Sequence, residues 1–370
     1  MSSQGKTSYE PDLVSPPGET LQDVLEERGL SQAQLAERMG RPKKTINEII
    51  QAKAAITPDT ALQLELVLQI PAHFWLAREA KYRASLARHE EHKRIELDVK
   101  FLDDLPMKEM INFGWIAKAT DKAEMVRNAL KFFGVVNSDK IPRLEEVAFR
   151  RSQSFATNPW ALAAWLRKGE LEAIKISTAE YDRERFHKTV MECRALTRKA
   201  PGDFVPELTS ACAKAGVALV FVRELPKTAV SGATRWLAPN RPMIQLSLRY
   251  KCDDLFWFAF FHECGHVLLE HAKREVLLEG VHSEQKVTAT QDPREVAANQ
   301  FAAETLIPDA ELATFLQKGT LTQRAIEEFA SCIKIAPGIL VGRLQHDNHL
   351  DWSRFRALKR TFSWDDWPVS

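Results

Sequence analysis

The most constraining stretch of this chain of 370 residues is His262-Glu263-Cys264-Gly265-His266. It lies within an apolar-rich run that predicts a buried helix over residues 253–269, with Asp254 as its N-cap. Residues four positions apart lie on the same face of a helix. His262 and His266 can therefore both point at one metal ion, which predicts a metal centre in the C-terminal half of the chain.

This spacing is the His-Glu-x-x-His arrangement of zinc peptidases. Neutral imidazole nitrogens bind zinc, and a catalytic zinc site keeps one position open for water. The metal lowers the pKa of that water to about 7, and a carboxylate takes its proton as it attacks a peptide carbonyl. We expect one Zn²⁺ per chain and Glu263 as the catalytic base. The alternative is a pair of hydrogen-bonded core histidines. Glu263 would then be a carboxylate on an apolar helix with no role to offset the cost of its burial.

A catalytic site of this kind needs a third protein ligand. Leu269 and Ala272 stand where the extended metzincin motif would have glycine and histidine, so that class is excluded. The better candidate is Glu295, among small residues that predict a second buried helix, where a carboxylate is costly unless it is paired or binds a metal. Asn299 lies on the same face and could hydrogen-bond a ligand. The alternative interpretation of Glu295 is an ordinary exposed helix glutamate.

Three motifs together resemble the ImmA/IrrE family of metallopeptidases over roughly residues 205–345: His-Glu-x-Gly-His, Glu-x-x-Ala-Asn-x-Phe-Ala and Leu306-Ile307-Pro308. The resemblance implies that His262, His266 and Glu295 bind the metal and that Glu263 is the base. It also implies a thermolysin-like (gluzincin-type) α/β peptidase domain. Strands are predicted at 217–222 and 243–248, and in such an architecture the second would be an edge strand that holds substrate by main-chain pairing.

The N-terminal part shows a different pattern. Helices are predicted at 20–27, at 32–39 between the N-cap Ser31 and Gly40, and from 41 to 50 with Pro42 near the first position. Two short helices joined by a tight turn with glycine form a helix-turn-helix motif. The second of these helices enters the major groove of DNA by its N-terminal end.

That N-terminal end carries Lys43, Lys44, Thr45 and Asn47, and Gln32 begins the preceding helix. Lysines can neutralise phosphates, and asparagine can pair bidentately with adenine. We therefore predict these five residues as DNA contacts. The alternative is a generic three-helix packing unit with a solvated lysine pair.

This segment resembles the Cro/repressor helix-turn-helix domains, and from about Pro17 to Tyr82 it is similar to the HigA-type antitoxins. The closer similarity rests on residues 46–50, 55–61 and 74–76. A departure is Pro42, where those proteins often have a serine N-cap. One helix-turn-helix reads one half-site, so we expect a homodimer on an inverted repeat in its own promoter.

Global features set the organisation. The fold class is multidomain and mainly α with an α+β part: a flexible arm at 1–16, an all-α helix-turn-helix domain at 17–90, a helical linker at 91–204, the metallopeptidase domain at 205–345 and an aromatic tail at 346–370. We expect the tail to fold back onto the peptidase or to contact a partner.

The net charge is only +1, so DNA affinity must come from a local patch. Five scattered cysteines argue against a disulfide framework, and neither a signal peptide nor a long apolar run is visible, so we expect a cytoplasmic protein without a membrane partner.

Three functions fit this sequence. The first is an antitoxin-like DNA-binding repressor whose fused zinc peptidase hydrolyses a peptide bond in a repressor or antitoxin-type protein. The second is a repressor that binds DNA and a toxin, with the peptidase fold as a sensor or docking platform without turnover. The third is a regulator with a vestigial metal site, against which the intact Glu263 argues.

Overall fold

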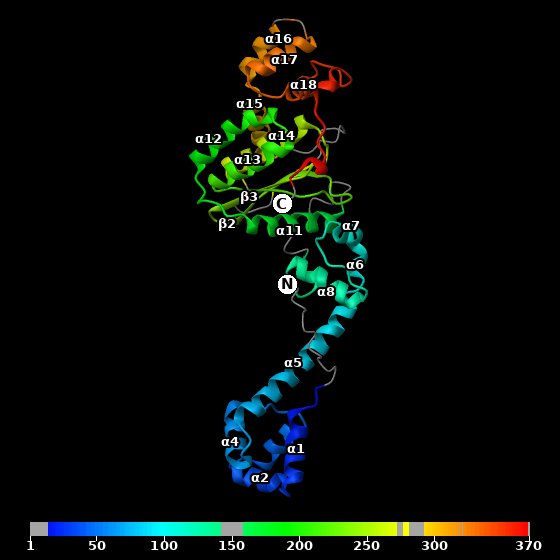
Figure 1. Ribbon diagram of the computed structural model, residues 1–370, viewed down its shortest axis with the longest axis vertical. Coiled ribbons are helices and arrows are strands. Elements are labelled where there is room, and N and C mark those ends of the chain that lie inside the picture. Colours follow the sequence, from blue (N-terminus) through cyan, green and yellow to red (C-terminus); the bar gives the residue numbers. More distant parts are fainter. Residues whose placement is uncertain are drawn as a thin grey trace, which may run out of the picture. The chain divides into compact units, whose positions relative to one another are not determined.

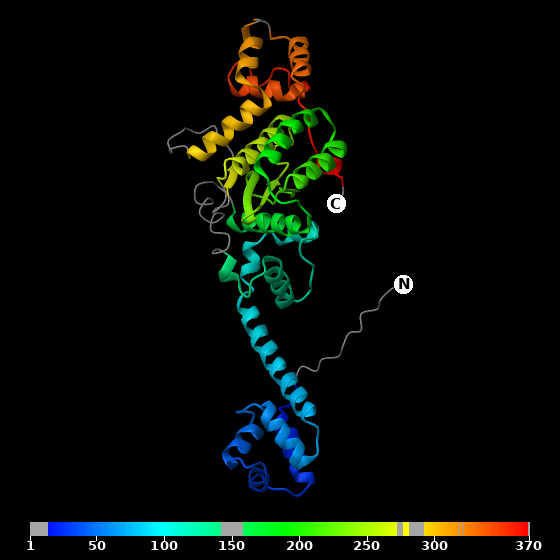
Figure 2. The same cartoon turned by 90° about the vertical axis from the view of Figure 1, so that its left-hand side faces the viewer.

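The structure is a computed structural model that describes residues 14–141, 158–271, 277–280, 292–317, 319 and 321–368. Of the predicted arm, residues 1–13 lie outside this range. The chain divides into two compact units, Met1–Val99 and Lys100–Ser370 (Figures 1 and 2). The domain boundaries predicted within the second unit stay predictions. No helix among the described residues is both long and apolar enough to cross a membrane.

The first unit is all-α. Its helices are α1 (Pro17–Glu27), α2 (Gln32–Met39), α3 (Lys43–Ile50), α4 (Pro58–Leu68) and α5 (Ala72–Leu97). Both predicted ends of α2 are confirmed: the Ser31 hydroxyl accepts from the Gln34 N–H at 3.2 Å, and Gly40 follows with φ +63°. Pro42 occupies the N-cap of α3 and not its first turn, so that part of the prediction is wrong by one position.

One core joins all five helices. Each contributes a completely buried side chain, namely Leu21, Leu35, Ile46, Leu64 and Trp75 in chain order. Burying such side chains contributes roughly 1.5–3 kcal/mol each. This core holds α2 and α3 in a fixed arrangement.

The second unit combines helices with a small sheet. Its helices are α6 (Phe101–Asp104), α7 (Met107–Asn112), α8 (Lys122–Phe133), α11 (Pro159–Lys175), α12 (Arg183–Cys193), α13 (Pro201–Lys214), α14 (Asp253–Leu268), α15 (Pro293–Leu306), α16 (Asp309–Gln317), α17 (Gln323–Cys332) and α18 (Pro337–His346). Its strands are β1 (Ala218–Phe221), β2 (Val230–Ala238), β3 (Arg241–Leu246) and β4 (Leu277–Gly280).

The four strands have the order β1-β3-β2-β4. Strand β3 runs parallel to β1 and antiparallel to β2, and β4 pairs antiparallel with β2. The second predicted strand, at 243–248, corresponds to β3, which lies between two neighbours, so the prediction that it is an edge strand is wrong. The alternation of apolar and polar residue types in its sequence could not distinguish an inner strand from an edge strand, because both bury at least one face.

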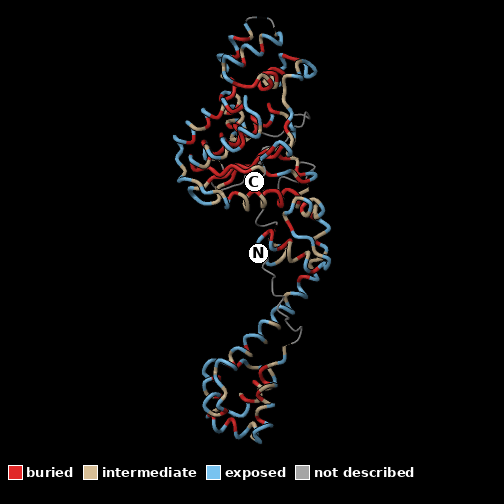
Figure 3. Tube along the Cα trace, in the orientation of Figure 1, coloured by how far each residue is buried: buried red, intermediate tan, exposed pale blue. Residues whose placement is uncertain are grey.

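Helices cover both faces of the sheet. Figure 1 shows α11 along one face and α12, α13 and α14 on the other, and buried residues concentrate along the sheet and α14 (Figure 3). Successive residues of a strand point to opposite faces. On β2, Thr234 accordingly contacts α14 through Glu263, and Arg235 contacts α11 through Glu170.

The C-terminal segment folds back onto the start of α14. Cys252, not Asp254, is the N-cap of this helix, so the predicted cap is wrong. Asp254 instead lies in the first turn, where its Oδ2 accepts from Lys359 Nζ at 2.7 Å, and Asp253 pairs with Arg360 at 3.1 Å. The tail also contributes Phe362 to the core. Of the two predicted fates of the aromatic tail, the structure shows the first.

A buried glycine provides a test of this packing. A Cβ at Gly169 of α11 would lie 1.7 Å from Oε1 of Gln245, whose Nε2 donates to the Trp165 carbonyl at 2.7 Å. We expect Gly169→Ala to lower the free energy of unfolding by about 1–3 kcal/mol because the helix would be overpacked against β3. Urea denaturation followed by circular dichroism measures this. Gly202→Ala is the control, since a Cβ there meets nothing within 4 Å. Equal stability of both variants would contradict the packing described.

Candidate functional site

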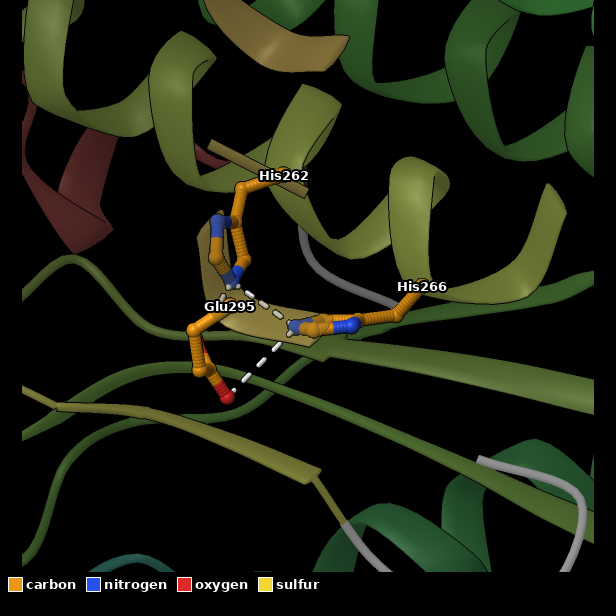
Figure 4. Close-up of side chains that lie close together, drawn as sticks. All are labelled: His262, His266 and Glu295. Atoms are coloured by element: carbon orange, nitrogen blue, oxygen red, sulfur yellow. Dashed lines mark hydrogen bonds and ion pairs between the residues drawn. The ribbon is translucent and has the colours of Figure 1, made fainter. Parts of the chain in front are cut away.

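Three side chains from two helices converge at one point (Figure 4). His262 and His266 extend from α14, and their Nε2 atoms lie 2.9 Å apart. Glu295 of α15 places Oε2 3.3 Å from Nε2 of His262 and Oε1 3.7 Å from Nε2 of His266. One ligand atom from each residue lies within 4.8 Å of the others, so the group could hold a metal ion. The structure thus brings together the three residues that the sequence predicted as ligands.

Small residues permit the approach of the two helices. A Cβ at Gly265 would lie 3.3 Å from Cα of Ala298, closer than nearly all real Cβ contacts, and Ala298 and Ala302 on α15 are buried. Helix α14 therefore needs a glycine at the point where it meets α15. This contact lets Glu295 reach both histidines.

The outer nitrogens of the two imidazoles also have partners. Nδ1 of His262 lies 2.8 Å from Oδ1 of Asn299. An amide oxygen only accepts, so Nδ1 of His262 carries the proton and Nε2 turns its lone pair toward the centre. Nδ1 of His266 lies 3.2 Å from Nδ1 of His271, just after α14. The sequence analysis did not identify this contact.

The electrostatics suit a cation. Burial alone would raise the pKa of Glu295, but the nearby His262 and His266 outweigh burial and hold the pKa well below its usual range. Burial, together with His262 and His271, lowers the pKa of His266 despite the opposing effect of Glu295. The site therefore favours a carboxylate at Glu295 and a neutral imidazole at His266. Two imidazoles and one carboxylate are a donor set that zinc accepts, so these residues fit such an ion.

Glu263 stands outside this triad. It is completely buried on α14, and its Oε2 accepts from the Thr234 hydroxyl of β2 at 2.5 Å. The sequence marked Glu263 as the base but assigned no role to Thr234. Cys264 is buried, and burial raises the pKa of its thiol well above the usual value.

The second candidate cluster of potential ligands is structural. Cys252, Asp253 and Asp254 lie close enough to hold an ion. Both carboxylates, however, pair with Lys359 and Arg360 of the C-terminal segment. They join the tail to α14.

The predicted DNA contacts lie at the beginnings of α2 and α3. Lys43 and Lys44 are exposed, and Gln32, Thr45 and Asn47 are partly exposed. The side chain of Lys44 is 84% exposed to solvent, although its Nζ lies 3.8 Å from Oε1 of Glu48. Their neighbour Arg41 is held by Asp59 and Gln63 of α4. Arg41 thus stabilises the turn between the two helices.

Comparison with known proteins identifies both parts. Residues 21–75 match the helix-turn-helix family model, and residues 214–337 match the model of the IrrE N-terminal-like domain. The chain therefore joins a helix-turn-helix domain, of the type that binds DNA, to an IrrE/ImmA-like domain, and both predicted resemblances are confirmed.

The individual proteins that this chain resembles each cover less than a quarter of it. Virulence-associated protein A of Dichelobacter nodosus is 39% identical over 62 residues, which are 16% of this chain and 61% of that protein. The chain thus spans about three fifths of this relative's length. A HigA-family addiction module antidote protein of Coxiella burnetii is 29% identical, with a TM-score of 0.21, over 23% of this chain and 94% of that one. The antitoxin HigA of Pseudomonas aeruginosa, solved with the higBA promoter, is 30% identical, with a TM-score of 0.22, over 23% of this chain and 95% of its own.

The metal centre yields the next prediction. Purified protein should carry about one zinc per chain. His262→Ala or His266→Ala should abolish binding, and Glu295→Ala should weaken it strongly, because each removes a converging donor. Elemental analysis after dialysis against limited chelator measures occupancy. Glu304→Ala is the matched control, since Glu304 lies on the same helix but is exposed. Full zinc occupancy in Glu295→Ala would show that Glu295 is not a ligand.

Proposed function

We propose that this protein is an antitoxin-like transcriptional repressor with a fused zinc-dependent metallopeptidase that hydrolyses a peptide bond in a repressor or antitoxin-type protein. The convergence of His262, His266 and Glu295 beside the buried Glu263 carries this proposal. The helix-turn-helix domain on the same chain supports a substrate or partner from gene regulation. Regulators of this kind act on DNA in the cytoplasm, and we propose a thermolysin-like (gluzincin-type) architecture for the peptidase.

The proposed chemistry assigns one role to each residue. Bound zinc would polarise the peptide carbonyl and acidify the attacking water. His262, His266 and Glu295 would hold the ion, while Asn299 fixes the ring of His262 through the 2.8 Å contact at Nδ1. Glu263 would accept the proton of the water and pass it to the leaving amine. Its buried position excludes bulk water from this proton transfer.

Glu263→Gln tests the role of the base. Glutamine keeps the shape of the side chain but cannot accept the proton, so zinc content should stay unchanged while proteolysis falls by at least about 100-fold. Mass spectrometry would detect cleavage after incubation with purified helix-turn-helix repressors and antitoxins. Undiminished cleavage by Glu263→Gln would refute the role. If the zinc-loaded parent cleaves none of them, the data favour a repressor that binds a toxin and uses the peptidase fold as a sensor.

For the N-terminal unit we propose operator binding as a homodimer on an inverted repeat in its own promoter. The exposed ammonium groups of Lys43 and Lys44 suit phosphate contacts. Asn47 lies one turn further along α3, where a side chain can reach a base edge. The first two turns of α3 would thus combine positioning on the backbone with reading of the sequence.

Two kinds of variant separate these contacts. Lys43→Ala and Lys44→Ala should weaken binding to all sequences and reduce the salt dependence by about one ion each. Asn47→Ala should cost about 1–3 kcal/mol and relax preference at one base pair. Electrophoretic mobility shifts with promoter DNA at several salt concentrations measure both effects. Lys81→Ala on α5 is the control for a general loss of charge. If the parent does not shift promoter DNA at low salt, the proposal of operator binding is wrong.

A further inference from the structure

The buried base is held by a strand, and this contact has no role in the function proposed so far. Thr234 lies on β2, is completely buried, and donates its hydroxyl to Oε2 of Glu263 at 2.5 Å. The same hydroxyl lies 3.2 Å from the main-chain oxygen of Glu263. A single side chain of the sheet therefore contacts both the carboxylate and the main-chain carbonyl of the residue that we assign as the base.

The other carboxylate oxygen meets the same strand two residues earlier. A Cβ at Gly232 would lie 2.5 Å from Oε1 and 2.8 Å from Cγ of Glu263. Residues two apart on a strand point to the same face. Gly232 thus leaves room for one oxygen while Thr234 hydrogen-bonds the other, and the carboxyl group lies between β2 and α14.

The strand itself is firmly fixed. Gly232 and Thr234 pair with Leu246 and Ile244 of β3 on one side. On the other side they pair with Glu279 and Leu277 of β4. A donor on such a strand cannot move away without breaking main-chain hydrogen bonds.

We propose that Thr234 is a positioning residue for the peptidase reaction, whose hydroxyl sets the orientation of the Glu263 carboxyl group in the space that Gly232 leaves open. The proposal rests on the proposed function, because it assumes that Glu263 is the base. Misplacement of a reacting group by about 1 Å can cost about 100-fold in rate. A fixed carboxyl group would therefore raise kcat without changing the affinity for substrate.

Three full-length, zinc-loaded variants test this. Thr234→Val keeps the shape and removes the hydroxyl, and Thr234→Ser keeps the hydroxyl and removes the methyl group. Thr228→Val is the matched control, since Thr228 is also buried but donates to the Leu225 carbonyl at 2.7 Å. The readouts are the position of the Glu263 carboxyl group in crystals, and kcat and KM on the best-cleaved member of a fluorescence-quenched random peptide library.

We expect Thr234→Val to displace the carboxyl group and to lower kcat by about 10–100-fold at unchanged KM and zinc content. Thr234→Ser should restore the position of the carboxyl group and most of kcat, and Thr228→Val should resemble the parent. An unmoved carboxyl group in Thr234→Val, or equal losses in Thr234→Val and Thr234→Ser, overturns the proposal. If the parent cleaves no library member, the crystals still decide: displacement of the carboxyl group in Thr234→Val alone supports the positioning of Glu263 by Thr234, while the incubation with helix-turn-helix proteins decides the proposed function separately.

Discussion

Burial of polar groups on one apolar helix governs the second unit. Helix α14 carries His262, Glu263 and His266 inside the core, where an unpaired polar or charged group costs several kcal/mol. Two of the elements packed against this helix bring partners. Helix α15 supplies Glu295 and Asn299, and β2 supplies Thr234. The packing of α15 and β2 against α14 thus satisfies polar groups whose burial would otherwise be destabilising.

The same requirement explains the C-terminal segment. Asp253 and Asp254 start α14 and are buried, so each needs a cation. Lys359 and Arg360, more than a hundred residues later, provide one each. Helix α14 thus depends on distant parts of the chain both at its first turn and in its second half. This gives the candidate metal site a rigid base, because the helix that carries His262 and His266 is held at both places.

The first unit differs from the second, because its candidate binding residues are polar side chains at the surface. Its five helices share a small apolar core, and the N-cap Ser31 and the C-cap Gly40 limit α2 to eight residues. The start of α3 therefore projects Lys43 and Lys44 into solvent. Cap residues and apolar spacing are local signals, so this part of the fold could be predicted closely from sequence, with an error of one position at Pro42.

For the second unit, the sequence by itself determined which side chains converge: His262 and His266, four residues apart on one helix, and Glu295 among small residues, which the structure brings together. It did not determine strand order, the true N-cap of α14 or the partners of its acidic first turn. Thr234 also had no visible signal, since it lies in β2, between the two strands that the sequence predicted. Helix periodicity is local, whereas strand neighbours and buried hydrogen bonds join residues far apart in the chain, and only the tertiary structure brings those residues into contact.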